Sequence, residues 1–132
     1  MATTIKKTVT KKTAPKSFSE GRLYINTTFN NTLVSICDPK GNTLSWSSSG
    51  HAGFKGARKS TPYAATTAID KVLDTARTIG IKKLSIYIKG PGTGRDAVLR
   101  LLRTKRDFDI ELIADITPIP HNGPRPPKAR RV

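Results

Sequence analysis

Short stretches in which apolar and polar residues alternate begin soon after residue 20. They are rich in β-branched and aromatic side chains, which are typical of β-strands. These stretches are residues 22–29, 32–37 and 43–48. Asn30 and Asn31 tolerate a positive φ, and residues 38–42 contain proline and glycine at turn positions. The pattern predicts three consecutive antiparallel strands joined by tight turns.

After residue 60 the apolar spacing becomes helical. Apolar residues between 65 and 79 recur every three or four positions. Thr61 has the side chain of a helix N-cap, and Pro62 suits the first helical position. Gly80 is a natural residue to end a helix, because it adopts a left-handed backbone without strain. The spacing therefore predicts a long helix between Thr61 and Gly80.

The remaining elements repeat the strand–helix–strand order. Residues 83–89 alternate like a strand, and a second helix is expected at about 95–105. The outer face of that helix should be basic, with Arg100, Arg103, Lys105 and Arg106. A last strand at about 108–116 is expected to place on one face Phe108, Ile110, Leu112, Ala114 and Ile116.

The element order is therefore βββαβαβ. Two strand–helix–strand crossovers require helices packed against a sheet that begins as an antiparallel meander. The expected fold is one α/β domain with a mixed sheet, and its topology resembles the ribonuclease H fold. Asp74 and Arg77 lie three residues apart on the first helix and should pair on its exposed side.

Charge divides the chain into three parts. The 132 residues carry a net charge of +15. Residues 1–20 and residues 117–132 each carry a net charge of +4, and residues 21–116 carry +7. We expect a basic flexible extension at 1–20, a folded domain at 21–116 and a proline-rich basic tail at 117–132. Such a chain favours polyanions, with nucleic acid before an acidic membrane surface. A solubilising tail and an organelle transit peptide are alternative interpretations of the first 20 residues.

The sequence shows no arrangement of residues that is typical of an enzyme active site. A nuclease of ribonuclease H topology needs an acidic residue on its first strand, and residues 22–28 contain none. Cys37 is the only cysteine and is expected to be buried, and the two histidines lie in distant loops. No apolar run suits a membrane span, and the first 19 residues contain no apolar stretch typical of a secretory signal. We expect no catalytic residue, no metal and no cofactor.

Two glycine-rich basic loops precede the two helices. Residues 49–60 include Lys55, Arg58 and Lys59, and residues 90–94 have the spacing GxGxG. Both loops should lie at one end of the sheet, where backbone N–H groups and cations would meet phosphates. A tight turn that needs a positive φ is the alternative explanation of the second loop. Trp46 and Phe54 either stack on RNA bases or belong to the core.

Several longer motifs, taken together, are more specific than any of these features. They are the motifs Phe29–Thr32, Gly53–Tyr63, Lys89–Arg95, Asp115–Gly123 and Arg125–Lys128, followed by Arg130 and Arg131. Over about residues 21–132 the chain resembles the family of the eleventh protein of the small ribosomal subunit, in its bacterial or organellar form. Two local departures are Pro124, where the family commonly has cysteine, and residues 103–107, which are one residue longer and lack the usual helix-ending glycine.

The resemblance implies a structural, non-catalytic protein on the platform of the small subunit. It implies binding to the platform rRNA near the path of mRNA at the exit site, in a bacterial cytoplasmic ribosome or an organellar one. The implied neighbours are the sixth, seventh, eighteenth and twenty-first proteins of that subunit, without a membrane or a second copy of the chain. The implied rRNA contacts are Asn30, Asn31, Lys55, Gly56, Arg58, Lys59, Ser60, Lys89, Gly92, Arg95, His121, Asn122, Arg125, Lys128, Arg130 and Arg131.

One motif also carries a chemical hypothesis. Asn122 precedes Gly123. Glycine leaves the following peptide nitrogen unhindered, so the asparagine can cyclise to a succinimide and reopen as isoaspartate. A plain turn is the alternative explanation of this pair.

Overall fold

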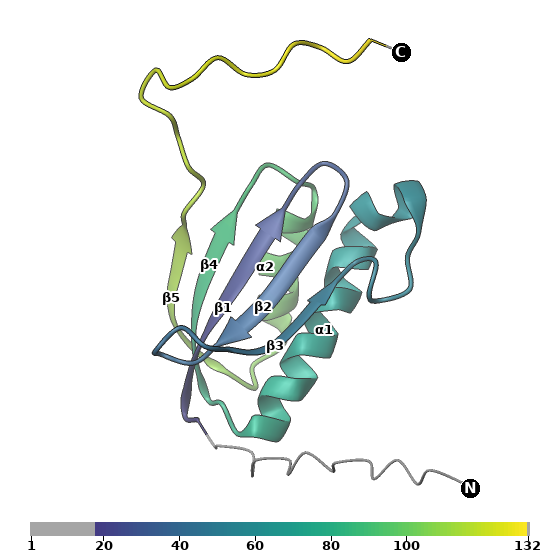
Figure 1. The fold of residues 1–132 in the computed structure, drawn as a ribbon. Helices are drawn as coiled ribbons and strands as arrows, with labels where there is room; N and C mark the ends of the chain where they lie inside the picture. Colours follow the sequence, from purple (N-terminus) through teal and green to yellow (C-terminus); the bar gives the residue numbers. More distant parts are fainter. Residues whose placement is uncertain (1–17, 132) are drawn as a thin grey trace, which may run out of the picture.

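The computed structural model describes residues 18–131, which form a five-stranded sheet covered on one face by two helices (Figure 1). In chain order the elements are β1 (Glu20–Thr27), β2 (Thr32–Cys37), β3 (Thr43–Ser48), the 3-10 helix η1 (Gly56–Ser60), α1 (Pro62–Ile79), β4 (Lys83–Lys89), α2 (Gly94–Thr104) and β5 (Asp109–Asp115). This confirms the βββαβαβ order. Most of the predicted basic extension lies outside the described residues.

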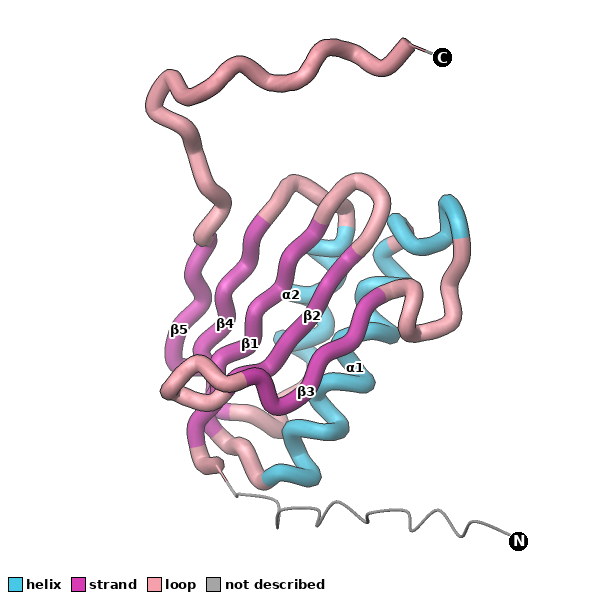
Figure 2. The backbone as a smooth tube through the Cα atoms, viewed as in Figure 1, coloured by secondary structure: helices cyan, strands magenta, loops and turns pink. Residues whose placement is uncertain are grey.

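The sheet is mixed, as expected. Its strand order is β3-β2-β1-β4-β5. β1 pairs antiparallel with β2 and parallel with β4, while β3 and β5 form the two edges. The parallel pairs need the two helical crossovers, which return the chain across the same face of the sheet (Figure 2).

The core lies between the sheet and the helices. Leu23, Ile25 and Ile86 project from the central strands and are almost completely buried against Ile69 and Leu73 of α1. The opposite face of the sheet has no helix over it, and there Tyr24 and Tyr87 stack with ring centroids 5.1 Å apart. Burial of one face explains why alternation along these strands was a reliable signal.

The ends of α1 follow the predicted capping chemistry. The Thr61 hydroxyl accepts a hydrogen bond from the Ala64 N–H at 3.3 Å. Gly80 has a φ of 94°, and its N–H donates to the Ala76 carbonyl. The expected pair of Asp74 and Arg77 is present at 2.8 Å.

Two expectations about the last third of the chain are wrong. The pairing of β4 with β5 is irregular between Leu84 and Ser85, so Leu112 and Ala114 lie opposite Ser85 and Tyr87 on the open face rather than on the face of Ile110. Leu112 is therefore 46% exposed. Lys105 does not remain on an exposed basic face, because its ammonium pairs with Asp70 of α1.

Candidate nucleic-acid interface

Four segments meet at one end of the sheet, which we call the loop end. β1, β4 and β5 run parallel, and β3 has the same direction because β1 and β3 are both antiparallel to β2. The C-terminal ends of these four strands therefore point the same way (Figure 1). The loop end thus gathers residues 28–31, 49–61, 90–93 and the start of the tail at 116. The Thr93 hydroxyl donates to the Ser60 carbonyl at 2.6 Å and joins the two glycine-rich loops. The prediction that both loops lie at the same end is confirmed.

The turn between β1 and β2 is held by Thr28. Its hydroxyl accepts from the N–H groups of Asn30 and Asn31 at 3.3 and 3.0 Å. The side chain of Asn31 accepts from the Thr32 N–H, whereas Asn30 is exposed. Phe29 lies in the same turn and is 75% exposed. Sequence reasoning placed Phe29 at a strand end; its position directly before two turn asparagines was the available signal.

The loop at 49–60 presents its cations to solvent. Gly53 and Gly56 have φ values of 104° and 60°, which shape a bend that other residues adopt only with strain. Lys55 and Arg58 are exposed, and Lys59 and Ser60 are half-buried. A pocket of about 360 Å³ is lined by Ala52, Gly53, Phe54, Lys55 and Arg58.

Neither Phe54 nor Trp46, the two aromatic residues considered for base stacking, is buried in the core. Phe54 is half-buried and packs edge-on against Tyr63, with ring centroids 5.7 Å apart. Trp46 is 61% exposed and lies beside His51. The core interpretation of Trp46 is therefore wrong, and its ring is available to a partner. Cys37 is buried, as expected.

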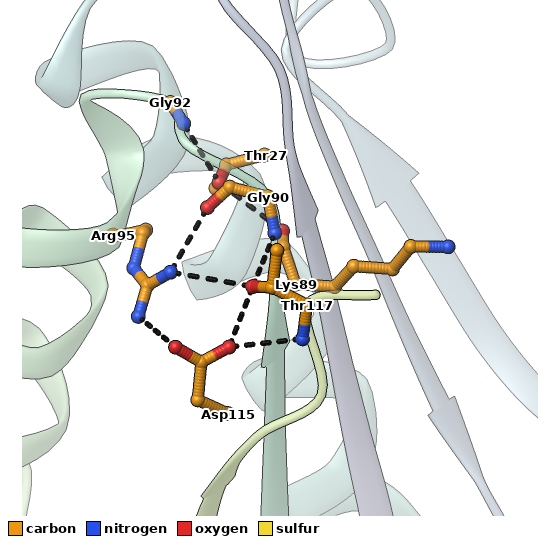
Figure 3. Close-up of polar contacts among 7 residues, drawn as sticks. All are labelled: Thr27, Lys89, Gly90, Gly92, Arg95, Asp115 and Thr117. Atoms are coloured by element: carbon orange, nitrogen blue, oxygen red, sulfur yellow. Dashed lines mark hydrogen bonds and ion pairs between the residues drawn. The ribbon is translucent and has the colours of Figure 1, made fainter. Parts of the chain in front are cut away.

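The loop at 90–94 is packed against the end of β1. The Gly92 N–H donates to the Thr27 hydroxyl and the Gly90 N–H to the Thr117 hydroxyl, each at 3.2 Å (Figure 3). A Cβ atom at Gly90 would overlap the Thr27 carbonyl oxygen, and one at Gly92 would stand 2.5 Å from the Thr28 carbonyl oxygen. These glycines permit close backbone approach. Two N–H groups that a phosphate could have used are already bonded.

Arg95 is committed to contacts inside the chain. Its guanidinium donates to the Gly90 carbonyl at 3.1 Å and pairs with the Asp115 carboxylate at 2.8 Å. The Thr117 hydroxyl and N–H donate to the same carboxylate at 2.6 and 3.0 Å. Hydrogen bonds from Thr117 and Arg95 hold the pKa of the Asp115 carboxyl well below its usual range. We call these four residues the tail clasp, because they fix the point where the tail leaves β5.

Lys89 contrasts with Arg95. Its side chain is exposed and points away from the tail clasp (Figure 3). Its ammonium has no hydrogen-bond or ion-pair partner among residues 18–131. Of the two cations that flank the glycine-rich loop, Lys89 is the one available to a phosphate.

The tail extends away from the domain after Thr117 (Figures 1 and 2). Asn122 turns the chain with a φ of 59°. All the tail residues predicted to contact RNA are exposed, namely His121, Asn122, Arg125, Lys128, Arg130 and Arg131. The structure therefore presents the tail cations as an extended arm next to the loop end.

The acidic residues form no metal site in the described part of the chain. Within it, no group of three or more histidine, cysteine or acidic side chains could hold an ion. Asp107, Glu111 and Asp115 instead pair with basic side chains. Neither helix of residues 18–131 has the length and apolar character needed to traverse a bilayer.

Comparison with known families identifies the polyanion that this chain binds. The family model described as Ribosomal protein S11 matches residues 21–131. The chain belongs to this family. Members of the ribosomal protein S11 family are structural proteins of the small ribosomal subunit that bind rRNA, and they are not enzymes. The resemblance seen in the sequence is thus confirmed, and the chain is a ribosomal protein whose anionic partner is rRNA.

Proposed function

We propose that this protein helps to fold and hold the platform of the small subunit, near the path of mRNA at the exit site. The observation that carries the proposal is the loop end, where the sheet topology gathers three loops and the basic tail on one side. Phosphate contacts fix the position of a protein on RNA, and shape recognition follows from how those contacts are arranged. A rigid end with an extended arm suits a folded rRNA region.

The residues at the loop end fall into two groups, according to whether their side chains are free to contact RNA. Lys55, Arg58 and Lys89 are exposed cations on the rigid loops and are assigned to phosphates. The exposed ring of Phe29 is assigned to an unpaired base, because single-stranded bases stack on aromatic side chains. The other contacts that the resemblance implies remain in the proposal, with Gly92 and Arg95 contributing through the backbone fold rather than through free polar groups.

The neighbouring proteins and the type of ribosome are part of the same proposal. The neighbours are the sixth, seventh, eighteenth and twenty-first proteins of the small subunit. The ribosome is the cytoplasmic one of a bacterium, and an organellar ribosome is the alternative. The support for these statements is the set of motifs that the chain shares with the bacterial and organellar form of the family.

Tethered cleavage of rRNA tests the placement. A Cys37→Ser background removes the native thiol, and an iron chelate is attached to Lys55→Cys or Arg125→Cys in reconstituted small subunits. Hydroxyl radicals should cut the platform rRNA strongly from both positions. A chelate at Lys82→Cys, beyond the opposite end of the sheet, should cut these sites weakly. Strong cleavage confined to rRNA outside the platform contradicts the proposal.

A further inference from the structure

Residues 107–119, which we call the β5 edge, differ in charge from the rest of the chain. The whole chain has nine acidic residues and a net charge of +15. Four of those nine lie in the β5 edge, which contains no lysine or arginine: Asp107, Asp109, Glu111 and Asp115. Three of these carboxylates pair with Arg77, Lys83 and Arg95, and the segment itself has no cation to offer a phosphate, so this edge is a poor surface for RNA.

The same segment exposes large apolar side chains. Nine large hydrophobic residues are exposed in the described part of the chain, and four of them fall within eight consecutive positions. These four are Leu112 at 46%, Ile113 at 53%, Ile116 at 43% and Ile119 at 78%. Single exposed apolar residues are ordinary, but here four of the nine lie in one short segment on and after an edge strand.

The backbone of β5 is open as well. β5 is the last strand of the sheet, so its outer row of peptide groups pairs with no other strand of residues 18–131 (Figure 2). Soluble proteins usually protect such an edge with lysine, proline or a covering element. Here Leu112 and Ile113 stand in mid-strand and face opposite sides of the sheet, opposite Ser85 and Ile86 respectively.

We infer that the β5 edge binds an extended, basic segment of another protein, which adds to the sheet as a sixth strand. The unpaired peptide groups provide the hydrogen bonds of strand addition, and the exposed aliphatic side chains provide apolar contacts. Asp109 has no ion-pair partner among residues 18–131, and Glu111 pairs with Lys83 at 3.4 Å through side chains that are both about half exposed, so both carboxylates can complement lysines or arginines on the added strand. The edge carries one aromatic ring, Phe108, and it is buried. The edge therefore lacks a platform for stacking bases, which favours a peptide over RNA.

This partner is separate from the rRNA at the loop end. The inference rests on the strand β5 itself, whereas the proposed function rests on the loops and on the tail cations, which begin at Arg125; the two share only residues 115–119. A protein that failed to bind platform rRNA would still have the β5 edge, so the two statements fail independently.

A peptide titration followed by nuclear magnetic resonance tests the inference on the full chain. The probe is a synthetic peptide in which lysine alternates with valine and isoleucine. Its counterpart replaces each lysine with glutamate and keeps length and pattern. The amide signals of 109–115 should shift and gain protection from exchange with the lysine peptide alone. Neutralising Asp109→Asn and Glu111→Gln together should weaken this binding about fivefold.

A matched pair of variants separates the apolar contact from general loss of stability. Leu112 and Leu33 are both 46% exposed on strands. Leu112→Thr should weaken the lysine peptide severalfold, and Leu33→Thr should leave it unchanged. Both variants should bind the platform rRNA fragment as tightly as the unmodified protein.

Three results would overturn the inference. Equal binding of the glutamate peptide would show that charge complementarity is absent. Protection of 109–115 by the rRNA fragment would make the edge part of the RNA interface. Sedimentation of the unmodified protein as a dimer that Leu112→Thr dissociates would make a second copy the occupant.

Discussion

The two glycine-rich loops of the loop end have similar sequences and different structural roles. Each precedes a helix and contains several glycines, with basic residues inside the loop at 49–60 and on either side of the loop at 90–94. In the loop at 90–94 the glycines bring the backbone against Thr27, and the N–H groups of Gly90 and Gly92 are bonded within the chain. In the loop at 49–60 the glycines bend an open segment whose cations face solvent. Glycine and positive charge before a helix therefore do not distinguish a binding loop from a packed one.

The largest expected effect is on folding and separates the two loops directly. Gly90 and Gly53 both have a positive φ near 100°, but only Gly90 abuts another backbone segment. Gly90→Ala should lower the free energy of unfolding by more than about 3 kcal/mol, because strain and steric overlap add. Gly53→Ala carries the strain alone and should cost about 1–2 kcal/mol. Urea unfolding measures both, and equal losses would mean that the packing of the 90–94 loop is unimportant.

The next effect is on rRNA affinity and concerns the open loop. Lys55→Ala with Arg58→Ala should weaken platform rRNA binding about tenfold at moderate salt, because two phosphate contacts are lost. The slope of log affinity against log salt should become shallower by about 1.5. Lys40→Ala with Lys82→Ala removes the same charge beyond the opposite end of the sheet. If both double variants weaken rRNA binding equally, the loop contributes only its net charge and not specific phosphate contacts.

A smaller effect separates the two cations that flank the packed loop. Lys89→Ala should make the salt slope shallower by about 1, as expected for one phosphate contact. Arg95→Ala should weaken rRNA binding without changing the slope, because it releases the tail clasp rather than a phosphate. Limited proteolysis near Thr117 should speed up in Arg95→Ala only. If Arg95→Ala makes the slope of log affinity against log salt shallower, Arg95 itself contacts a phosphate.

The tail clasp also predicts a response to acid. Because the folded state lowers the pKa of Asp115, its contribution to stability is present above the ordinary value of 3.8 and is lost as pH falls through the lower folded value. Asp115→Asn lacks this contribution. The unmodified protein should therefore be more stable than the variant at neutral pH, and the difference should shrink at progressively lower pH below about 4. A difference in urea midpoint that stays constant down to the lowest pH would contradict the role of the carboxylate.

The smallest effect concerns the tail itself. Asn122 is exposed at a positive φ and precedes glycine. Mild ageing at neutral pH should convert part of it to isoaspartate, as seen by peptide mapping. Asn122→Gln should stay unmodified, because its longer side chain closes a ring much more slowly. Absence of isoaspartate at 122 in the aged protein would leave the Asn-Gly pair as a plain turn.

Sequence periodicity predicted the order of the elements because β1, β2 and β4 each bury one face and α1 has clear caps. It failed at Leu112, since the irregular pairing of β5 depends on β4 and leaves no local mark. It left Trp46 open between the core and RNA stacking, because hydrophobicity alone does not say which face of a strand is covered.

The candidate site also has features that the sequence predicted and features that it could not predict. The two glycine-rich loops could be predicted to converge because the strands before them, β3 and β4, run in the same direction. The role of Arg95 could not be read from its own surroundings in the sequence, because its partner Asp115 lies 20 residues away. Likewise, the need for glycine at position 90 arises from Thr27, on a strand made much earlier in the chain.

The tail clasp has a consequence for synthesis of the protein. Ribosomes build chains from the N-terminus, and domains generally begin to fold while the chain is being made. The hydrogen bonds that complete the loop end come from Asp115, the last residue of β5, and from Thr117, which follows every strand and helix of the domain. The tail cations emerge even later. A nascent chain therefore lacks its full rRNA-binding end until the residues after β5 have been made, which delays commitment to RNA until the rest of the domain has emerged.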